Sequence, residues 1–206
     1  MGFALDEAAV NRGADVTVVA GDVTDRSAVF AAIKVHGVSR IIHLASLLGT
    51  TTSLDPTRGI NVNSIGTEHV FSVAKEASLE RVVWASSQSV YRRRGQYESL
   101  LGGGTVTEDD PPIPRDVYGG TKLVNELLAE QCAASGLDVV GLRPVLTIGP
   151  AQQFGAVGIL INAMRDAVVS GHGVVGAPWT YTGRSIPFTC TTVRSSSSRP
   201  ACGQIR

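Results

Sequence analysis

The stretch Arg81-Val-Val-Trp-Ala-Ser86 decides the fold class of this chain. It is a short run of β-branched and aromatic residues, which is typical of a buried strand. Three further runs have the same character, at Val16-Thr-Val-Val-Ala20, Arg40-Ile-Ile-His-Leu-Ala45 and Leu137–Leu142. We therefore predict four short strands.

Helical patterns separate the predicted strands. Arg26–Val35 follows Asp25, a plausible N-cap, and 63–77 and Tyr118–Ser135 follow the next two strands. Gly136 is a good residue to end the last of these helices. Strands that alternate with helices at this spacing predict right-handed crossovers and an α/β fold, a Rossmann-like doubly wound parallel sheet. The apolar stripes expected to face the core are Val29, Ala32 and Ile33 in the first helix and Val70, Val73, Ala74 and Ala77 in the second.

Polar side chains gather where the predicted strands end. In open parallel sheets, ligands bind beyond the carboxyl ends of the strands. We therefore expect a ligand site at this edge of the sheet. The residues placed there are Asp22, Ser46, Ser86, Ser87 and Arg143.

Composition excludes several classes of partner. The 206 residues carry 18 basic and 18 acidic side chains, so no general attraction to nucleic acid or to a membrane surface is expected. No apolar run is long enough to span a bilayer. Cys132, Cys190 and Cys202 match no zinc or redox spacing, which favours a cytoplasmic setting and no metal site. His43 lies on a strand that enters the core, so we expect it to be a buried structural histidine.

The stretch Tyr118-Gly-Gly-Thr-Lys122 places a phenol and an ammonium on one helix face. A nearby lysine stabilises a phenolate, so we expect Lys122 to lower the tyrosine pKa. Such a tyrosine can act as a general acid or base. The Tyr-x-x-x-Lys spacing is common by chance, so the acid/base hypothesis depends on the motifs around it.

Six motifs occur in one order along the chain. They are Gly21-Asp22-Val23-Thr24-Asp25, His43-Leu44-Ala45-Ser46, Asn63-Ser64-Ile65-Gly66-Thr67, Ser86-Ser87-Gln88-Ser89-Val90-Tyr91, Tyr118-Gly-Gly-Thr-Lys122, and Leu142-Arg143-Pro144 followed by Ile148-Gly149-Pro150. This series resembles the extended short-chain dehydrogenase/reductase superfamily, and within it the NAD-dependent epimerase/dehydratase family. The resemblance covers roughly residues 16–180.

The resemblance implies an oxidoreductase that acts on a nucleotide sugar or a related hydroxyl/keto substrate. Tyr118 would be the catalytic acid/base, with Lys122 as its partner and as a ligand of the nicotinamide ribose. Ser87 would hold the substrate oxygen against Tyr118. The alternative for Ser86 and Ser87 is that their hydroxyls simply cap the next turn.

The resemblance also implies a cofactor, NAD or NADP, with NAD favoured. Asp22 would accept a hydrogen bond from the adenine, or bind the adenosine ribose, or only cap its own turn. Asn63 would organise the loops of the site. Arg143 would lie on the segment that passes the nicotinamide, or it would serve as a buried ion-pair partner. The implied cofactor-binding set is Asp22, Val23, Leu44, Ala45, Ser46, Asn63, Ser86, Tyr118, Lys122, Arg143 and Pro144.

The chain departs from the family pattern at both ends. No G-x-x-G-x-x-G turn occurs, so we expect the first strand and the phosphate-binding Gly-rich turn to be missing. We expect a partial dinucleotide-binding domain over 1–150 and the start of a curtailed substrate region over 151–181. The tail, 182–206, is expected to be disordered or, beyond about Thr189, out of frame.

These departures leave a second hypothesis open, a degenerate non-catalytic nucleotide-binding module or an inactive fragment of such an enzyme. The family resemblance also implies a homodimer, formed through the helices at 63–77 and 118–135.

Overall fold

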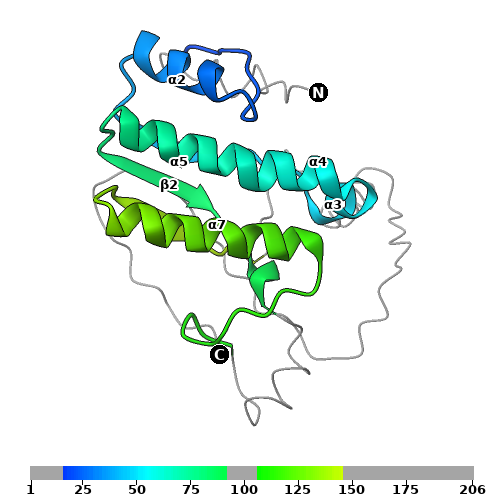
Figure 1. The fold of residues 1–206 in the computed structure, drawn as a ribbon. Helices are drawn as coiled ribbons and strands as arrows, with labels where there is room; N and C mark the ends of the chain where they lie inside the picture. The colour runs from blue at the N-terminus through cyan, green and yellow to red at the C-terminus, as the bar shows by residue number, and fades with distance from the viewer. Residues whose placement is uncertain (1–15, 92–105, 146–206) are drawn as a thin grey trace, which may run out of the picture. The chain divides into compact units, whose positions relative to one another are not determined.

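The computed structural model describes residues 16–91 and 106–145 (Figure 1). The chain divides into two units, Met1–Pro144 and Val145–Arg206, and every described element belongs to the first. In chain order the elements are α2 (Arg26–Val35), β1 (Arg40–His43), α3 (Gly49–Leu54), α4 (Pro56–Ile60), the π-helix η1 (Asn61–Ile65), α5 (Gly66–Glu76), β2 (Arg81–Ala85), the 3-10 helix η2 (Gln88–Val90), α7 (Val117–Ala134) and β3 (Val139–Leu142).

Several predictions from the sequence fall outside the described residues. They are the missing first strand and Gly-rich turn before residue 16, the substrate region 151–181, in which the sequence also predicts a helix at Gly155–Ser170, and the tail 182–206. The domain boundary at 150 stays a prediction.

The sheet has three parallel strands in the order β1-β2-β3. Its register pairs Ile41 with Val82 and Val82 with Val139. The parallel α/β architecture predicted from the sequence is confirmed, and these three strands lie within two residues of their predicted ends. Two helices also match: α2 has the predicted bounds, and α7 begins and ends one residue early.

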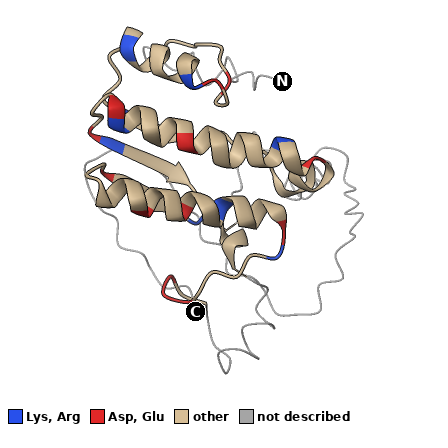
Figure 2. Cartoon of the chain, viewed as in Figure 1, with Lys and Arg blue, Asp and Glu red and all other residues tan. Residues whose placement is uncertain are grey.

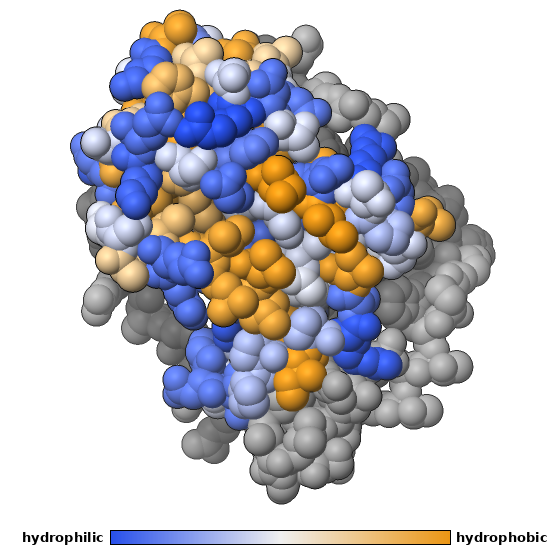
Figure 3. Space-filling model, in the orientation of Figure 1, coloured by the Kyte–Doolittle hydropathy of each residue, from blue (hydrophilic) through white to orange (hydrophobic). Residues whose placement is uncertain are grey.

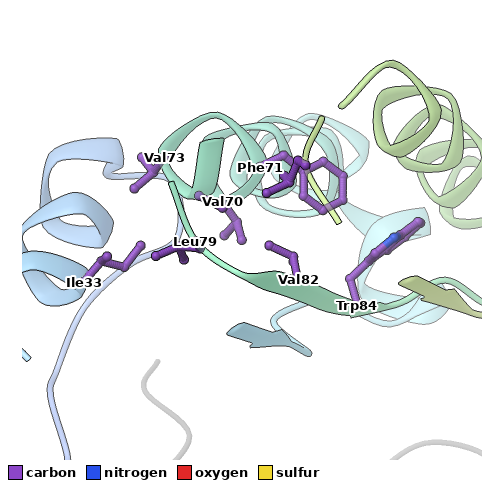
Figure 4. Packing of buried hydrophobic residues seen from close by; sticks show 9 residues of the cluster. Ile33, Val70, Phe71, Val73, Leu79, Val82 and Trp84 are labelled. Carbon is purple, nitrogen blue, oxygen red and sulfur yellow. The ribbon is translucent and has the colours of Figure 1, made fainter. Parts of the chain in front are cut away.

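The core lies between the sheet and the row of α2, α5 and α7 (Figures 1 and 4). Val82 and Trp84 point from β2 toward these helices and are 0% and 1% exposed. The Trp84 ring meets Phe71 of α5 edge-on, with the centroids 5.8 Å apart. Such T-shaped pairs are favoured by the ring quadrupoles. The predicted stripe on α5 is confirmed, since Val70, Val73 and Ala74 are buried there.

The opposite face of the sheet is open in the described part of the chain. Ile42, Val83 and Val140 form a row across the three strands on that face. Ile42 is 71% exposed and Val140 is 38% exposed. Helices of the described residues therefore cover one face, and the helices expected on the second face are not among them.

The prediction of a strand at Val16–Ala20 is wrong. This segment is exposed, with Val18 at 61%, and it pairs with no strand of the described residues. A hollow of about 560 Å³ is lined by Val19 and Ala20 from this segment and by Ile41 from β1. A strand requires a hydrogen-bonded neighbour about 4.8 Å away, and the described part of the chain provides none here.

Helices α3 and α4 and the π-helix η1 fill the crossover from β1 to α5, where a helix was predicted only from residue 63. The start of α4 carries ordinary signals: Asp55 accepts a hydrogen bond from Arg58 N at 3.0 Å, and Pro56 is the first helical residue. The turn at η1 is of the wide i→i+5 type, which is often found at functional sites.

Charged residues of both signs are spread over the described elements (Figure 2). Ion pairs tie the strand starts together: Arg40 Nε lies 2.8 Å from Glu80, and Arg81 Nε lies 2.7 Å from Asp138. These exposed pairs contribute little stability. In the described part of the chain, no helix combines the length and the apolar character needed to cross a bilayer.

Candidate active site

The first turn of α7 places Tyr118 at the carboxyl edge of the sheet. Asp116 caps this helix and accepts a hydrogen bond from Gly119 N at 2.7 Å. The hydroxyls of Ser87, which follows β2, and Ser46, which follows β1, lie close enough to the Tyr118 hydroxyl to lower its pKa by hydrogen bonding. Three segments far apart in the sequence thus converge on one phenol.

The expectation that Lys122 lowers the Tyr118 pKa is wrong for the protein without ligands. Burial raises the pKa of Tyr118 above its ordinary value of 10.0, against the hydrogen bonds of Ser87 and Ser46, which lower it, and with the Asp116 carboxylate, which raises it further. The lysine does not lower it, because the pKa of Lys122 itself is about 8 and the amine is uncharged at the pH where a tyrosine with a pKa above 10.0 loses its proton. The phenol therefore holds its proton at neutral pH.

Lys122 is buried one helical turn beyond Tyr118, at 3% exposure. Its Nζ donates to the carbonyl oxygen of Ala85 at 2.9 Å, at the end of β2. Burial lowers the pKa of Lys122 to about 8, because the charged ammonium loses its hydration. The side chain is therefore still charged at neutral pH but close to its titration point.

Ser87 begins η2 and is 8% exposed. Its hydroxyl oxygen accepts a hydrogen bond from Ser89 N at 3.1 Å, so the hydroxyl also caps the next turn, as the alternative interpretation held. The start of α7 lies very close to this turn: a Cβ at Gly119 would come 2.2 Å from Ser89 O. A glycine at 119 therefore allows Tyr118 to reach Ser87.

Asn63 holds the loop that follows β1. It is fully buried, and its Oδ1 accepts hydrogen bonds from Leu47 N at 2.7 Å and from Ser46 Oγ at 3.2 Å. Its Nδ2 donates back to Leu47 O at 3.0 Å. The predicted role of organising a site loop is supported by these contacts.

His43 is a buried structural histidine, as predicted, with 7% exposure. The Thr67 hydroxyl donates to Asn63 O at 2.6 Å, so at 2.9 Å it accepts from His43 Nε2–H. Burial, together with the Lys122 charge, lowers the pKa of His43 to about 4. Asn125 Nδ2 joins the network by donating to Asn63 O at 2.7 Å.

Asp22 and Val23 lie on an exposed turn before α2. Asp22 Oδ1 accepts from Thr24 N at 2.9 Å and from Thr24 Oγ1 at 2.8 Å. These hydrogen bonds lower the pKa of the Asp22 carboxyl, which is ionised at neutral pH. Val23 packs against the start of α5, where a Cβ at Gly66 would lie 2.7 Å from Val23 Cγ1. The turn chemistry of Asp22 is present, and its role toward a cofactor stays a prediction.

The remaining predicted residues also lie at this edge. Leu44 and Ala45 are exposed beyond the end of β1. Pro144 O accepts from Gln88 N at 3.1 Å, which joins the segment after β3 to η2.

Arg143 is an ion-pair partner in the structure. It forms a fork on Glu126 of α7, with Nε 2.8 Å from Oε1 and Nη2 2.8 Å from Oε2. Ser86 Oγ donates to the same Oε1 at 2.6 Å. Reasoning from sequence did not identify Glu126, although its position four residues after Lys122 on one helix face was a usable signal.

A parallel sheet with crossover helices and polar residues gathered at its carboxyl edge defines a Rossmann-like α/β protein. The sequence profile of the NAD dependent epimerase/dehydratase family matches residues 3–186. The chain belongs to this family.

Individual relatives agree with this assignment. A UDP-glucose 4-epimerase of Halalkalibacterium halodurans is 31% identical over 132 residues, which cover 63% of this chain and 37% of the relative. A 3 beta-hydroxysteroid dehydrogenase/Delta 5-->4-isomerase of Mycobacterium tuberculosis is 28% identical over 166 residues, which cover 75% of this chain and 40% of the relative. The structure of MoeE5 in complex with UDP-glucose and NAD superposes with a TM-score of 0.61 at 31% identity, covering 72% of this chain and 46% of that one. The chain thus spans about 40% of the length of these curated relatives.

Proposed function

We propose that the chain performs nicotinamide-dependent oxidation and reduction of a secondary hydroxyl or ketone, with Tyr118 as acid/base, Lys122 as its partner and Ser87 as the substrate-holding hydroxyl. One observation carries this proposal: the Ser87 hydroxyl, the Tyr118 phenol and the buried Lys122 ammonium meet at the carboxyl edge of the sheet.

The donor set at this edge fits the nicotinamide end of NAD. A buried ammonium whose hydrogen-bond partner is one backbone carbonyl has further protons to donate, and ribose hydroxyls accept them. The exposed strand end at Leu44 and Ala45 offers backbone groups to the cofactor, and Asp22 offers an ionised carboxylate to a hydroxyl or amino group. NAD, when bound, supplies the hydride acceptor and donor.

The diphosphate of the cofactor finds no matching site among the described residues. The N-terminus of α2 is capped by Asp25, whose carboxylate accepts from Ala28 N at 3.0 Å. That carboxylate occupies the amide and repels an anion. The N-terminus of α7 is capped in the same way by Asp116. The fit of the described residues is therefore limited to the nicotinamide end.

The proton chemistry follows from the positions of the three side chains. When a carbonyl is reduced, the Tyr118 phenol gives its proton to the substrate oxygen. In the oxidative direction the substrate hydroxyl gives its proton to the phenolate form of Tyr118, which the raised pKa makes the minor form at neutral pH. The Ser87 hydroxyl donates to the same substrate oxygen and stabilises its charge. The charge of Lys122 favours the phenolate once the phenol has lost its proton.

The substrate class that best fits is a nucleotide sugar or a related hydroxyl/keto compound. The relatives are named for UDP-glucose and for 3 beta-hydroxysteroids, which share an oxidisable secondary hydroxyl. We place this activity in the cytoplasm, as a small-molecule reaction without nucleic acid or membrane.

We also propose a homodimer formed through the helices at 63–77 and 118–135, which are the end of η1 with α5, and α7. Figure 3 shows apolar side chains gathered on the face that these helices share. The exposed fractions of Ile60, Ile65, Val124 and Leu127 lie between 45% and 54%. Apolar patches of this kind favour association, and helix pairs bury them by packing antiparallel to a second pair.

The test compares the wild-type chain with Tyr118→Phe. NADH binding is followed by fluorescence, and turnover is assayed with NAD and either UDP-glucose or a 3 beta-hydroxysteroid. We expect Tyr118→Phe to reduce turnover by at least about a hundredfold, since a positioned acid/base contributes about 10²–10⁴. NADH affinity should change little, because the ring of residue 118 remains.

Equal turnover by the two proteins would refute the role of Tyr118. NADH binding by the wild type without turnover of either probe would favour the non-catalytic nucleotide-binding module. A folded wild type that binds no NADH would exclude both functions for this chain.

A further inference from the structure

Glu126 lies at the centre of a hydrogen-bonded group beside the candidate site. Its Oε1 accepts from Ser86 Oγ at 2.6 Å and from Arg143 Nε at 2.8 Å, while Oε2 accepts from Arg143 Nη2 at 2.8 Å. The side chain is 14% exposed, against 45–72% for both members of the strand-start ion pairs. This is a charge-assisted fork in a largely dry position, where such contacts are strong.

The guanidinium of Arg143 also contacts Tyr91 and Glu108. Its Nη1 donates to the hydroxyl of Tyr91 and, at 3.3 Å, to Glu108 O. The guanidinium also stacks on the Tyr91 ring, 4.9 Å from its centre. Glu126 therefore joins the end of β3 and the segment after η2 to the same turn of α7.

The spacing of this group matches that of the candidate site. Tyr118, Lys122 and Glu126 are four residues apart and lie on one face of α7. Each contacts one of three successive residues at the end of β2. Tyr118 contacts the hydroxyl of Ser87, Lys122 contacts the carbonyl of Ala85, and Glu126 contacts the hydroxyl of Ser86.

We propose that Glu126 is a positioning residue: by holding Ser86 and Arg143, it fixes the end of β2 so that the Ser87 hydroxyl reaches the Tyr118 phenol. The proposal rests on the proposed function of Tyr118, and it assigns Glu126 no contact with substrate or cofactor. A carboxylate is suited to this task because both of its oxygens accept, and the Arg143 fork fixes their plane.

Glu126 stays ionised across the working pH range. Burial raises its pKa, but the hydrogen bonds from Arg143 and Ser86 and the guanidinium charge lower it more, so its pKa lies below its ordinary value of 4.5. The contact is therefore constant in any assay above that value.

The direction in which the Tyr118 pKa changes distinguishes a positioning role of Glu126 from a purely electrostatic one. Burial raises the pKa of the phenol most, the uncharged hydroxyls of Ser87 and Ser46 lower it, and Asp116 raises it. Lys122 also faces the phenol, with its Nζ 5.6 Å from the centre of the ring. If Glu126 acted only by its charge, its removal would lower the tyrosine pKa. If it acts by placing Ser87, its removal withdraws a hydrogen bond and raises the tyrosine pKa.

The experiment titrates Tyr118 in four proteins: wild type, Ser86→Ala, Glu126→Gln and the control Glu130→Gln, which makes the same change at an exposed position one turn along α7. Fluorotyrosine is incorporated because it titrates at lower pH than tyrosine, where the protein remains folded. Fluorine NMR resolves the chain's four tyrosines, and Tyr118→Phe assigns the signal.

We expect Ser86→Ala and Glu126→Gln to raise the Tyr118 pKa by about half to one unit, the worth of one hydrogen bond, and Glu130→Gln to leave it unchanged. An unchanged or lowered pKa in Ser86→Ala overturns the proposal, even where thermal stability falls. Ser86→Ala alters no charge and decides the question alone if Glu126→Gln does not fold. Since the titration needs no substrate, a raised pKa in a chain without turnover would keep the positioning role and reject only the catalytic function.

Discussion

Tyr118 has a raised pKa and Lys122 a lowered one, and burial is the main cause of both shifts. The phenol is neutral because burial outweighs the hydroxyls that bond to it, whereas the amine is lowered to about 8 by the same burial. Both shifts oppose charge formation in a dry site. A bound substrate oxygen that replaces one serine contact therefore meets a protonated phenol, which is the form required to reduce a carbonyl.

The buried imidazole of His43 should make the fold sensitive to acid. Its pKa is about 4 in the folded chain and 6.5 when exposed, so between these values the unfolded chain binds the extra proton. Stability is therefore lost as the pH falls from 6.5 to 4, by about 3 kcal/mol. His43→Gln keeps a donor for Thr67 and should lack this part of the acid dependence.

Urea unfolding at a series of pH values measures the effect. His36→Gln is the matched control, because His36 is exposed. An acid dependence of His43→Gln equal to that of the control would show that the His43 imidazole does not govern it.

At the scale of single residues, local pattern identified the site's polar groups but not their partners. His43 on a strand entering the core, and the i, i+4 pair of Tyr118 and Lys122, were visible in the sequence. The contact between Glu126 and Arg143 joins residues 17 apart on different elements. Its existence depends on how α7 packs beside β3, which no local spacing encodes.

Two adjacent glycines test how closely α7 approaches η2. A Cβ at Gly119 would lie 2.2 Å from Ser89 O and 3.0 Å from Pro114 Cβ, while a Cβ at Gly120 meets nothing within 4 Å. Gly119→Ala should lower the free energy of unfolding by about 1–3 kcal/mol through overpacking. Gly120→Ala should raise it by up to about 1 kcal/mol, because alanine is the better helix former.

Chemical denaturation of the two variants checks the pair. Similar changes in the free energy of unfolding of Gly119→Ala and Gly120→Ala would show that the start of α7 has room for a side chain at residue 119. Tyr118 would then be placed by other contacts.

At the scale of elements, the sequence predicted the helices whose apolar residues repeat with helical periodicity. The stripe of α5 and the bounds of α2 and α7 follow from local spacing and caps. Val16–Ala20 has the composition of a strand but finds no partner among the residues that the structure describes, and pairing is a property of two segments rather than one. Helix α3 was missed because Gly49-Thr-Thr-Thr-Ser-Leu54 contains poor helix formers that tertiary packing holds in place.

At the scale of the whole molecule, two apolar surfaces of the described residues compete as sites of association. One is the helix face with Val124 and Leu127, and the other is the open sheet face with Ile42. Leu127→Glu should weaken dimerisation by about a hundredfold, because each dimer loses two apolar contacts and buries two charges. Sedimentation over a range of concentrations measures the dissociation constant.

Ile42→Glu is the control on the second surface. Dissociation caused by Ile42→Glu but not by Leu127→Glu would place the interface on the sheet and reject the helix-mediated dimer.

The π-helix η1 has a consequence for how the chain tolerates insertion and deletion. Its i→i+5 bonding takes in one residue more than an α-helical turn. Deleting one residue of Asn61–Ile65 would therefore leave a continuous α-helical turn, with α4 and α5 close to their present angular phase. Gly59, whose Cβ would lie 2.4 Å from Thr52 of α3, would keep its place against that neighbour. A change of one residue in chain length at this point is thus absorbed within a single turn, without re-aiming either helix.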